Sequence, residues 1–180
     1  MNIREIVLDF ETTGLDPEKG HRIIEIGCVE LYNCIPTGRT YQTYINPERD
    51  VPSEATKIND IKTEFLKPFP VFAEIVDDFL AFIGQDRLVI HNAPFDLKFL
   101  NWELKRLNKQ PMTTRVIIDT LVIARLTFPG HPAKLNDLCN RFQIDLSKRT
   151  THGALIDCEL LAKVYPELLR SSSFVFLPNK

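Results

Sequence analysis

The 180-residue sequence lacks any apolar run long enough to cross a bilayer. Its longest runs, such as residues 23–26 and 88–90, are far shorter than the roughly 20 residues that a membrane-spanning helix requires. A charged and then apolar leader is also missing from its start. These absences predict a soluble, cytoplasmic protein.

Cysteines with metal-binding spacing are also absent. Cys28, Cys34, Cys139 and Cys158 form no CxxC motif and lie within apolar segments. A zinc site or a disulfide framework is therefore disfavoured, and we expect four reduced thiols in the core.

An excess of positive charge is the third absence. The chain has 22 basic and 24 acidic residues, which give a formal net charge of -2. This balance argues against a protein that holds nucleic acid through a broad basic field. Any polyanionic ligand must then be bound at a local site.

The length and composition suit one compact domain. A chain of 180 residues with 44% hydrophobic content can bury a full core, and no internal repeat or low-complexity tract divides it. Strand-like segments come first and helical ones follow, which indicates a layered α/β or α+β domain. We expect residues 1–170 to form the domain and residues 171–180 to form a short C-terminal tail.

Three segments rich in β-branched and aromatic residues predict an antiparallel three-stranded unit. They cover residues 5–10, 22–31 and 40–45 and are bounded by the turn formers Asp16-Pro17, Pro36-Thr37-Gly38 and Asn46-Pro47. Later apolar patterns predict two more strands, at 88–90 and 116–118. They also predict helices at 71–83, 94–107, 121–128, 135–142 and 153–169.

Two carboxylates lie two positions apart at the end of the first predicted strand. Side chains alternate across a strand, so Asp9 and Glu11 project to one face while Phe10 projects to the other. Neighbouring anions repel unless a cation joins them, and carboxylate oxygens are ligands that Mg²⁺ prefers. The pair therefore predicts a magnesium site.

Two further clusters carry candidate groups, although each has an ordinary structural explanation. Asp96 falls in the first turn of a predicted helix, where it could simply complement the helix dipole, and His91 could be a core histidine. His152 and Asp157 are five positions apart, a spacing that a continuous helix would separate by roughly 140°. His152 can therefore approach Asp157 only from a loop that ends near Gly153. It could act there as a general base, or the pair could be a loop residue and a solvated charge.

All three clusters occur in the order DxE, D and HxxxxD, each at a strand end or a helix start. The segments are DFETTGL at 9–15, HNAPFD at 91–96 and HGALID at 152–157. In these motifs the sequence resembles the DEDDh family of 3′–5′ exonucleases. The similarity extends over residues 6–165 and, within the family, is greatest to the proofreading epsilon subunits of bacterial DNA polymerase III.

The resemblance implies an α/β, ribonuclease-H-like exonuclease fold, in which helices flank a mixed five-stranded sheet. It implies that two divalent cations, Mg²⁺ or Mn²⁺, are bound by Asp9, Glu11, Asp96 and Asp157. His152 is the implied catalytic base. The implied activity is stepwise hydrolysis of the last phosphodiester of a DNA 3′ end, which releases nucleoside 5′-monophosphates during replication.

The same resemblance implies a set of contacts to the terminal nucleotide of a single-stranded or frayed DNA 3′ end. These residues are Thr12, Thr13, Leu15, Glu54, Asn59, His91, Asn92 and Phe95. Leu15 and Phe95 could equally be core residues, since apolar side chains after a turn or at a helix start usually are. Stacking on an aromatic side chain is, however, the usual way to hold a frayed end.

One departure from the epsilon subunits lies in the nucleotide pocket. Asn59-Asp60-Ile61 stands where those subunits usually read His-Gly-Ile. The charge and stacking surface of that histidine are therefore missing, although Asn59 retains a hydrogen-bond donor.

The second departure is the C-terminal tail. Epsilon subunits continue through a linker to a polymerase-binding segment, whereas this chain ends at Lys180. The apolar run 174–177, after a serine-rich lead, resembles a degenerate clamp-binding peptide without its glutamine. The resemblance thus implies two protein partners, the DNA polymerase III catalytic subunit and the sliding clamp. The alternative is a tail that only packs on the domain or frays.

Two other functions remain open on the sequence alone. An RNA 3′-end-trimming exoribonuclease of the same family would share every catalytic residue, so only rates on matched DNA and RNA oligonucleotides distinguish the two. A non-catalytic nucleic-acid-binding scaffold would be expected to have lost a metal ligand or the histidine, and the sequence retains them all.

Overall fold

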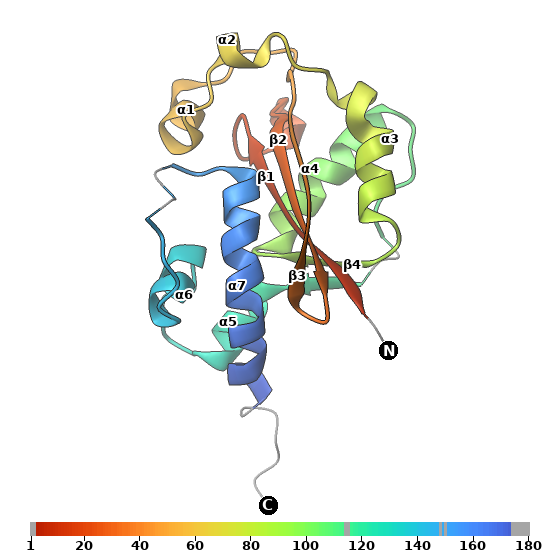
Figure 1. The fold of residues 1–180 in the computed structure, drawn as a ribbon. Helices are drawn as coiled ribbons and strands as arrows, with labels where there is room; N and C mark the ends of the chain where they lie inside the picture. The colour runs from red at the N-terminus through yellow and green to blue at the C-terminus, as the bar shows by residue number, and fades with distance from the viewer. Residues whose placement is uncertain (1–2, 114–115, 148, 150, 174–180) are drawn as a thin grey trace, which may run out of the picture.

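Five strands form a single mixed sheet in the computed structural model, which describes residues 3–113, 116–147, 149 and 151–173 (Figure 1). They are β1 (Arg4–Thr12), β2 (Ile23–Tyr32), β3 (Ile35–Tyr44), β4 (Arg87–Ile90) and β5 (Ile117–Asp119). Their spatial order is β3-β2-β1-β4-β5. The β1–β2 and β2–β3 pairs are antiparallel, whereas the β1–β4 and β4–β5 pairs are parallel. The expected antiparallel unit and mixed five-stranded sheet are confirmed.

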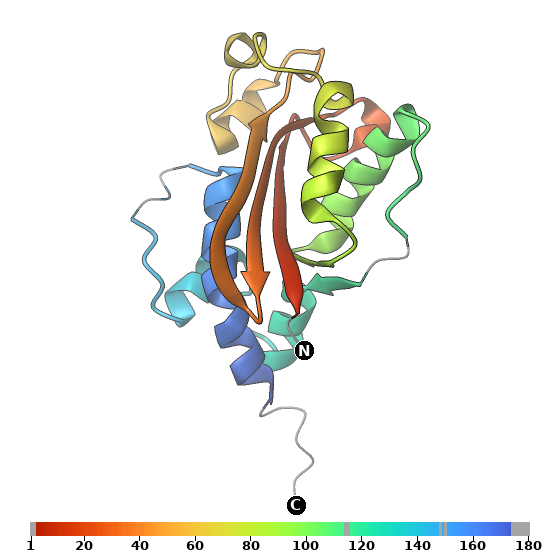
Figure 2. The same ribbon diagram turned by 45° about the vertical axis from the view of Figure 1, so that its right-hand side comes forward.

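Helices cover both faces of this sheet, as Figure 2 shows. On one face lie α3 (Phe72–Ile83) and α4 (Ala93–Arg106), and on the other lie α5 (Thr120–Thr127), α6 (Leu135–Arg141) and α7 (Ala154–Ser173). The short helices α1 (Ser53–Asn59) and α2 (Thr63–Leu66) lie beyond the carboxyl end of β1. None of the helices in the described ranges is long and apolar enough to cross a membrane.

The central strand, β1, alternates between the two faces. Ile6 and Leu8 belong to the core beneath α3 and α4, whereas Val7 belongs to the core beneath α7. Asp9 and Glu11 share the parity of Val7, so they lie on the α7 face of the sheet. This is the common face that the sequence alternation predicts for the two carboxylates.

The prediction of a turn at residues 36–38 is wrong. The chain reverses earlier, at Asn33 and Cys34, whose φ angles of 51° and 64° suit a two-residue hairpin turn. Pro36 and Gly38 already belong to β3. β3 is an outer strand of the sheet, where the missing N–H of a proline need not break a ladder hydrogen bond.

The sequence analysis misses α1, which carries Glu54, as well as α2 and the 3₁₀ turn η1 (Pro17–Lys19). These elements are three to seven residues long, too short to show an apolar period. α1 and α2 are held in place because Ile61, between them, and Leu66 of α2 pack against Ile24 in a small cluster of their own. As a result α1 borders the edge of the sheet where the sequence motifs meet.

The last helix is longer than predicted. α7 begins at Ala154 and continues to Ser173, four residues beyond the expected end. Residues 174–180, with the apolar run compared to a clamp-binding peptide, lie outside the described residues. The tail and its boundary at residue 170 therefore stay predictions.

All four cysteines are free thiols. Three are buried, as expected, but Cys34 is only half-buried because it forms part of the β2–β3 turn.

Candidate active site

Three parallel strands bring the sequence motifs to one edge of the sheet. β1, β4 and β5 run in the same direction, so the residues at their carboxyl ends meet there. Glu11 lies near the end of β1, His91 follows β4, and Asp119 ends β5. The Asp119 carboxylate accepts two backbone N–H groups at the start of α4, both at 3.2 Å. This contact fixes the first turn of α4, which carries Asp96.

α7 is held against β2 at the point where it delivers Asp157. Glu25 is buried on β2, opposite Glu11 in the antiparallel register, and its Oε2 accepts the Ala154 backbone N–H at 3.1 Å. Gly27 permits the close approach, because a Cβ there would lie 2.3 Å from a backbone atom at the start of α7. The sequence analysis missed Glu25, whose only signal is a charge inside an apolar strand.

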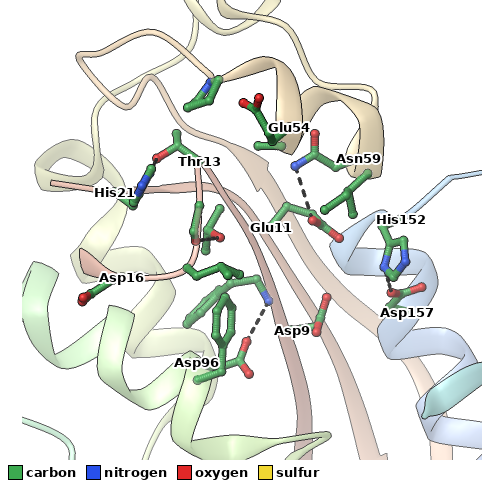
Figure 3. Close-up of a pocket in the computed structure, with 18 of the residues that line it drawn as sticks. Asp9, Glu11, Thr13, Asp16, His21, Glu54, Asn59, Asp96, His152 and Asp157 are labelled. Atoms are coloured by element: carbon green, nitrogen blue, oxygen red, sulfur yellow. Dashed lines mark hydrogen bonds and ion pairs between the residues drawn. The ribbon is translucent and has the colours of Figure 1, made fainter. Parts of the chain in front are cut away.

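Four carboxylates and one imidazole surround a common space (Figure 3). The ligand atoms of Glu11, His152 and Asp157 lie within 4.8 Å of one another. Asp96 faces them from α4, where its Oδ1 accepts a backbone N–H of β1 at 3.1 Å. Asp9 lies between Asp96 and Asp157. The structure thus brings together all the predicted metal ligands and the predicted base.

Burial and mutual repulsion shift most of these carboxyl groups toward the protonated form. Burial, together with neighbouring charges, raises the pKa of Asp9 well above its usual range, and burial does the same for Asp96. Burial also raises the pKa of Glu11 to about 7. Asp157 differs: burial alone would raise its pKa, but hydrogen bonds from Arg149 and the nearby imidazole lower it. Buried oxygen donors this close together fit divalent cations, which would offset their repulsion.

Arg149 is a site residue that the sequence analysis missed. Its Nε donates to Asp157 Oδ1 at 2.5 Å, and its Nη2 donates to Asp157 Oδ2 at 2.7 Å. Nη2 also lies 2.8 Å from Nδ1 of His152, and Nη1 donates to Asn136 at 2.9 Å. A bidentate pair of this kind combines strength with fixed geometry. Arg149 therefore holds Asp157 and the His152 loop together.

His152 approaches Asp157 from a loop that ends at Gly153, as its spacing predicts. Its Nδ1 lies 3.4 Å from Asp157 Oδ2, and its side chain is 49% exposed. Its backbone N–H donates to the Ile58 carbonyl of α1 at 3.2 Å. The imidazole is therefore accessible from solvent while its backbone is anchored.

A cavity of about 590 Å³, here named the catalytic cavity, opens beside these groups. Seven of the eight predicted substrate-binding residues line it, namely Thr12, Thr13, Leu15, Glu54, Asn59, His91 and Phe95. The eighth, Asn92, lines a neighbouring cavity instead.

Apolar side chains border the catalytic cavity. Leu15 is 81% exposed, so it is not a core residue, and Ile58 of α1, which the sequence analysis missed, is 53% exposed. Phe95 packs on the core, with its ring 5.1 Å from that of Phe99, and it also lines the cavity, so its contact with the terminal nucleotide stays a prediction. Such surfaces suit an unstacked base.

Asn59 points toward the carboxylates. Its Nδ2 donates to Glu11 Oε2 at 3.4 Å, and its Oδ1 accepts the Ile61 backbone N–H at 3.1 Å. The hydrogen-bond donor expected at this position is therefore present, and it contacts a predicted metal ligand.

Because of these raised pKa values, we expect the free energy of unfolding of the metal-free protein to depend on pH. The unfolded chain loses the Glu11 proton near the ordinary value of 4.5, whereas the folded protein holds it until about 7. Between pH 4.5 and about 7 the folded state therefore binds more protons than the unfolded state. The free energy of unfolding is accordingly highest below this range and falls as the pH rises through it. Glu11 alone should cost about 3 kcal/mol of unfolding free energy by pH 8. Urea titrations between pH 5 and 8 in a chelator measure this loss.

Two controls accompany that measurement. Glu11→Gln should reduce the pH dependence by the share of Glu11, because the variant has no proton to lose at that position, while Asp9 and Asp96 keep their raised pKa values. An excess of divalent cation should stabilise the protein more at pH 8 than at pH 5, since cations bind the ionised carboxylates. Equal stability of the metal-free protein across the range would contradict the electrostatic description of the site.

A mixed five-stranded sheet with carboxylates at the end of its central strand and an imidazole beside them defines a nuclease of the ribonuclease-H-like class. Comparison with known sequences narrows this class. The family model described as Exonuclease, of the RNase T type, matches residues 6–165. The chain therefore belongs to this exonuclease family.

Curated relatives agree with this assignment. The chain is 55% identical over 178 residues to the DNA polymerase III subunit epsilon of Rickettsia conorii, a match that covers 96% of the chain and 77% of that relative. It is 45% identical over 169 residues to the subunit of the same name from Escherichia coli, covering 90% and 70%.

Solved structures share the fold at lower identity. One is the nuclease domain of 3'hExo, a DEDDh family member bound to rAMP, with a TM-score of 0.77, 22% identity and coverage of 94% and 92%. Another is Exonuclease X in complex with 5′ overhanging duplex DNA, with a TM-score of 0.73, 21% identity and coverage of 94% and 93%. Both confirm the predicted fold class.

Proposed function

We propose that the protein is a 3′–5′ exonuclease that proofreads DNA during replication, as the epsilon subunit of a bacterial DNA polymerase III. One observation carries the proposal: every predicted metal ligand and the predicted base line one cavity of a chain 55% identical to an epsilon subunit. A non-catalytic scaffold would have no need of four neighbouring, mutually repelling carboxyl groups, three of them on buried residues.

Different residues of the catalytic cavity have different roles in hydrolysis. Two divalent cations, Mg²⁺ or Mn²⁺, would be held by Asp9, Glu11, Asp96 and Asp157. When bound, such cations stabilise the charge on the phosphate and make a water molecule more acidic. His152 takes the proton of the attacking water at a ring nitrogen, and the water oxygen attacks phosphorus in line. The bond from phosphorus to the 3′ oxygen breaks and this oxygen takes a proton from solvent, releasing a nucleoside 5′-monophosphate and a strand with a free 3′ hydroxyl.

The catalytic cavity favours an unpaired 3′ end. Leu15 and Ile58 offer apolar contacts to the terminal base, and Phe95 lies beside its sugar or base. A paired base must first leave its duplex, which costs a few kcal/mol and least for a mismatched base. This difference gives proofreading its selectivity.

Rates of nucleotide release from matched, mismatched and single-stranded ends test the proposal. With Mg²⁺, single-stranded and mismatched DNA ends should be degraded at least about tenfold faster than matched ends, the factor expected from about 1.4 kcal/mol of unpairing. DNA should also be degraded faster than RNA of the same sequence. Faster degradation of RNA would instead identify a 3′-end-trimming exoribonuclease.

We further propose that the protein works within the polymerase, in contact with its catalytic subunit and the sliding clamp. The support is the name shared by the relatives of 43–55% identity. The same assay, repeated with a polymerase III catalytic subunit and clamp, tests this: both should increase removal of mismatched ends.

A further inference from the structure

We propose that a second cavity beside the catalytic one binds the phosphates of the nucleotides that precede the 3′-terminal one. Its cationic ligands are Arg125 and Lys134. The inference rests on the proposed function, because it concerns the remainder of the same strand.

The second cavity measures about 1030 Å³ and lies between α5, α6 and the segment before α7. The two cavities share part of their walls, formed by Asp9, Leu15, His91, His152 and Asp157. They are therefore neighbours that meet at the catalytic groups.

The shared wall sets the path of the strand. The phosphate that is cleaved must lie against Asp9, Asp157 and His152, which belong to both cavities. The terminal nucleoside lies on one side of this phosphate and the rest of the strand on the other. With the terminal nucleoside in the catalytic cavity, the preceding nucleotides enter the second cavity.

The charges of the two cavities differ in the way this path requires. Beyond the shared wall, the catalytic cavity is lined by four carboxylates, from Glu11, Asp16, Glu54 and Asp96, against two basic residues, Lys19 and His21. Beyond the same wall, the second cavity is lined by the basic residues Arg125, His131, Lys134 and Arg149. Its one other carboxylate, that of Asp137, accepts the backbone N–H of Lys134 at 3.0 Å. In a chain of net charge -2, this local group of cations suits a polyanionic strand.

Arg125 and Lys134 are the cations available to phosphates. Arg149 is already engaged with Asp157 and Asn136. Arg125 and Lys134 are exposed, and neither forms an ion pair with any other residue that the structure describes. Arg125 also lies close to the shared wall: burial lowers the pKa of His91, and the Arg125 charge acts in the same direction.

Two substrates of different length distinguish binding in the catalytic cavity from binding in the second cavity. The p-nitrophenyl ester of thymidine 5′-monophosphate fills only the catalytic cavity, whereas an oligothymidylate reaches both. The double variant Arg125→Ala/Lys134→Ala should raise KM for the oligothymidylate about tenfold or more. It should leave kcat/KM for the ester within twofold. The slope of log KM against log salt should fall by about 0.7 for each lost phosphate contact.

The control is Arg87→Ala, which removes one positive charge, half of the change in the double variant, from an exposed residue at the start of β4. Arg87 lines neither cavity. It lies opposite Glu5 in the β1–β4 register, at the end of these strands remote from the catalytic groups. This variant should leave both substrates and the salt slope unchanged.

Anisotropy of a fluorescent oligothymidylate measures binding without turnover, and the double variant should raise its Kd by a similar factor. An unchanged KM and Kd for the oligothymidylate would overturn the inference, and so would an equal loss on both substrates. If the parent protein hydrolyses neither substrate, the proposed function fails, while anisotropy still decides the role of the second cavity.

Discussion

Replacement of Asp9 by asparagine is expected to slow the release of 3′-terminal nucleotides by about a thousandfold or more. This factor corresponds to a loss of about 4 kcal/mol of transition-state stabilisation by a cation-binding carboxylate, since about 1.4 kcal/mol changes a rate tenfold. Asparagine keeps the shape of the side chain but not the charge. The loss should therefore appear in kcat, measured by single-turnover hydrolysis at saturating enzyme.

The same substitution should not weaken the fold. Burial and the charges of Asp96 and Glu11 raise the pKa of Asp9 well above its usual range, so its ionised form destabilises the folded state. In a chelator at pH 8, Asp9→Asn should melt at the same temperature as the parent or higher. A parallel loss of stability and activity would show a folding defect and contradict the assignment, as would activity within tenfold of the parent.

Asp78→Asn is the matched control, because it makes the same chemical change on an exposed position of α3. It should alter neither the rate nor the melting temperature measurably. The comparison separates the loss of a carboxylate at the site from a general change in net charge.

The parts of the fold that could be predicted are those with a repeating local signal. The period-two alternation of β1 places Asp9 and Glu11 on one face, and the apolar period of α3 gives its start within one residue. The five-residue spacing of His152 and Asp157 predicts a loop that ends at Gly153, and the structure has it. Each of these features depends on neighbours along the chain.

The parts that could not be predicted depend on contacts between distant segments. Arg149 is recognisable only once the loop before α7 folds back on Asp157, and Glu25 only once α7 packs on β2. α1 is too short to be stable alone and forms where Ala55 and Asn59 become buried. The residues that position the catalytic groups are therefore less visible in the sequence than the catalytic groups themselves.

Replacement of His152 by alanine should reduce kcat by about 10²–10⁴-fold, the usual contribution of a general base. The fold should be unaffected, because the side chain is 49% exposed and Asp157 keeps its bidentate pair with Arg149. The rate is measured on single-stranded DNA with saturating Mn²⁺. A rate within tenfold of the parent would exclude His152 as the base.

The position of His152 also permits a second interpretation, which the same variant tests. Its ring lies within 4.8 Å of the ligand atoms of Glu11 and Asp157, close enough for a metal ligand. As a base, His152 should be replaceable by added imidazole, which can enter through the exposed position, and the restored rate should follow the unprotonated fraction of imidazole. The Kd for Mn²⁺, measured by electron paramagnetic resonance, should then be unchanged. A weakened Kd without rescue would make His152 a ligand, because a base acts on the proton of the water and leaves the carboxylates to bind the cation.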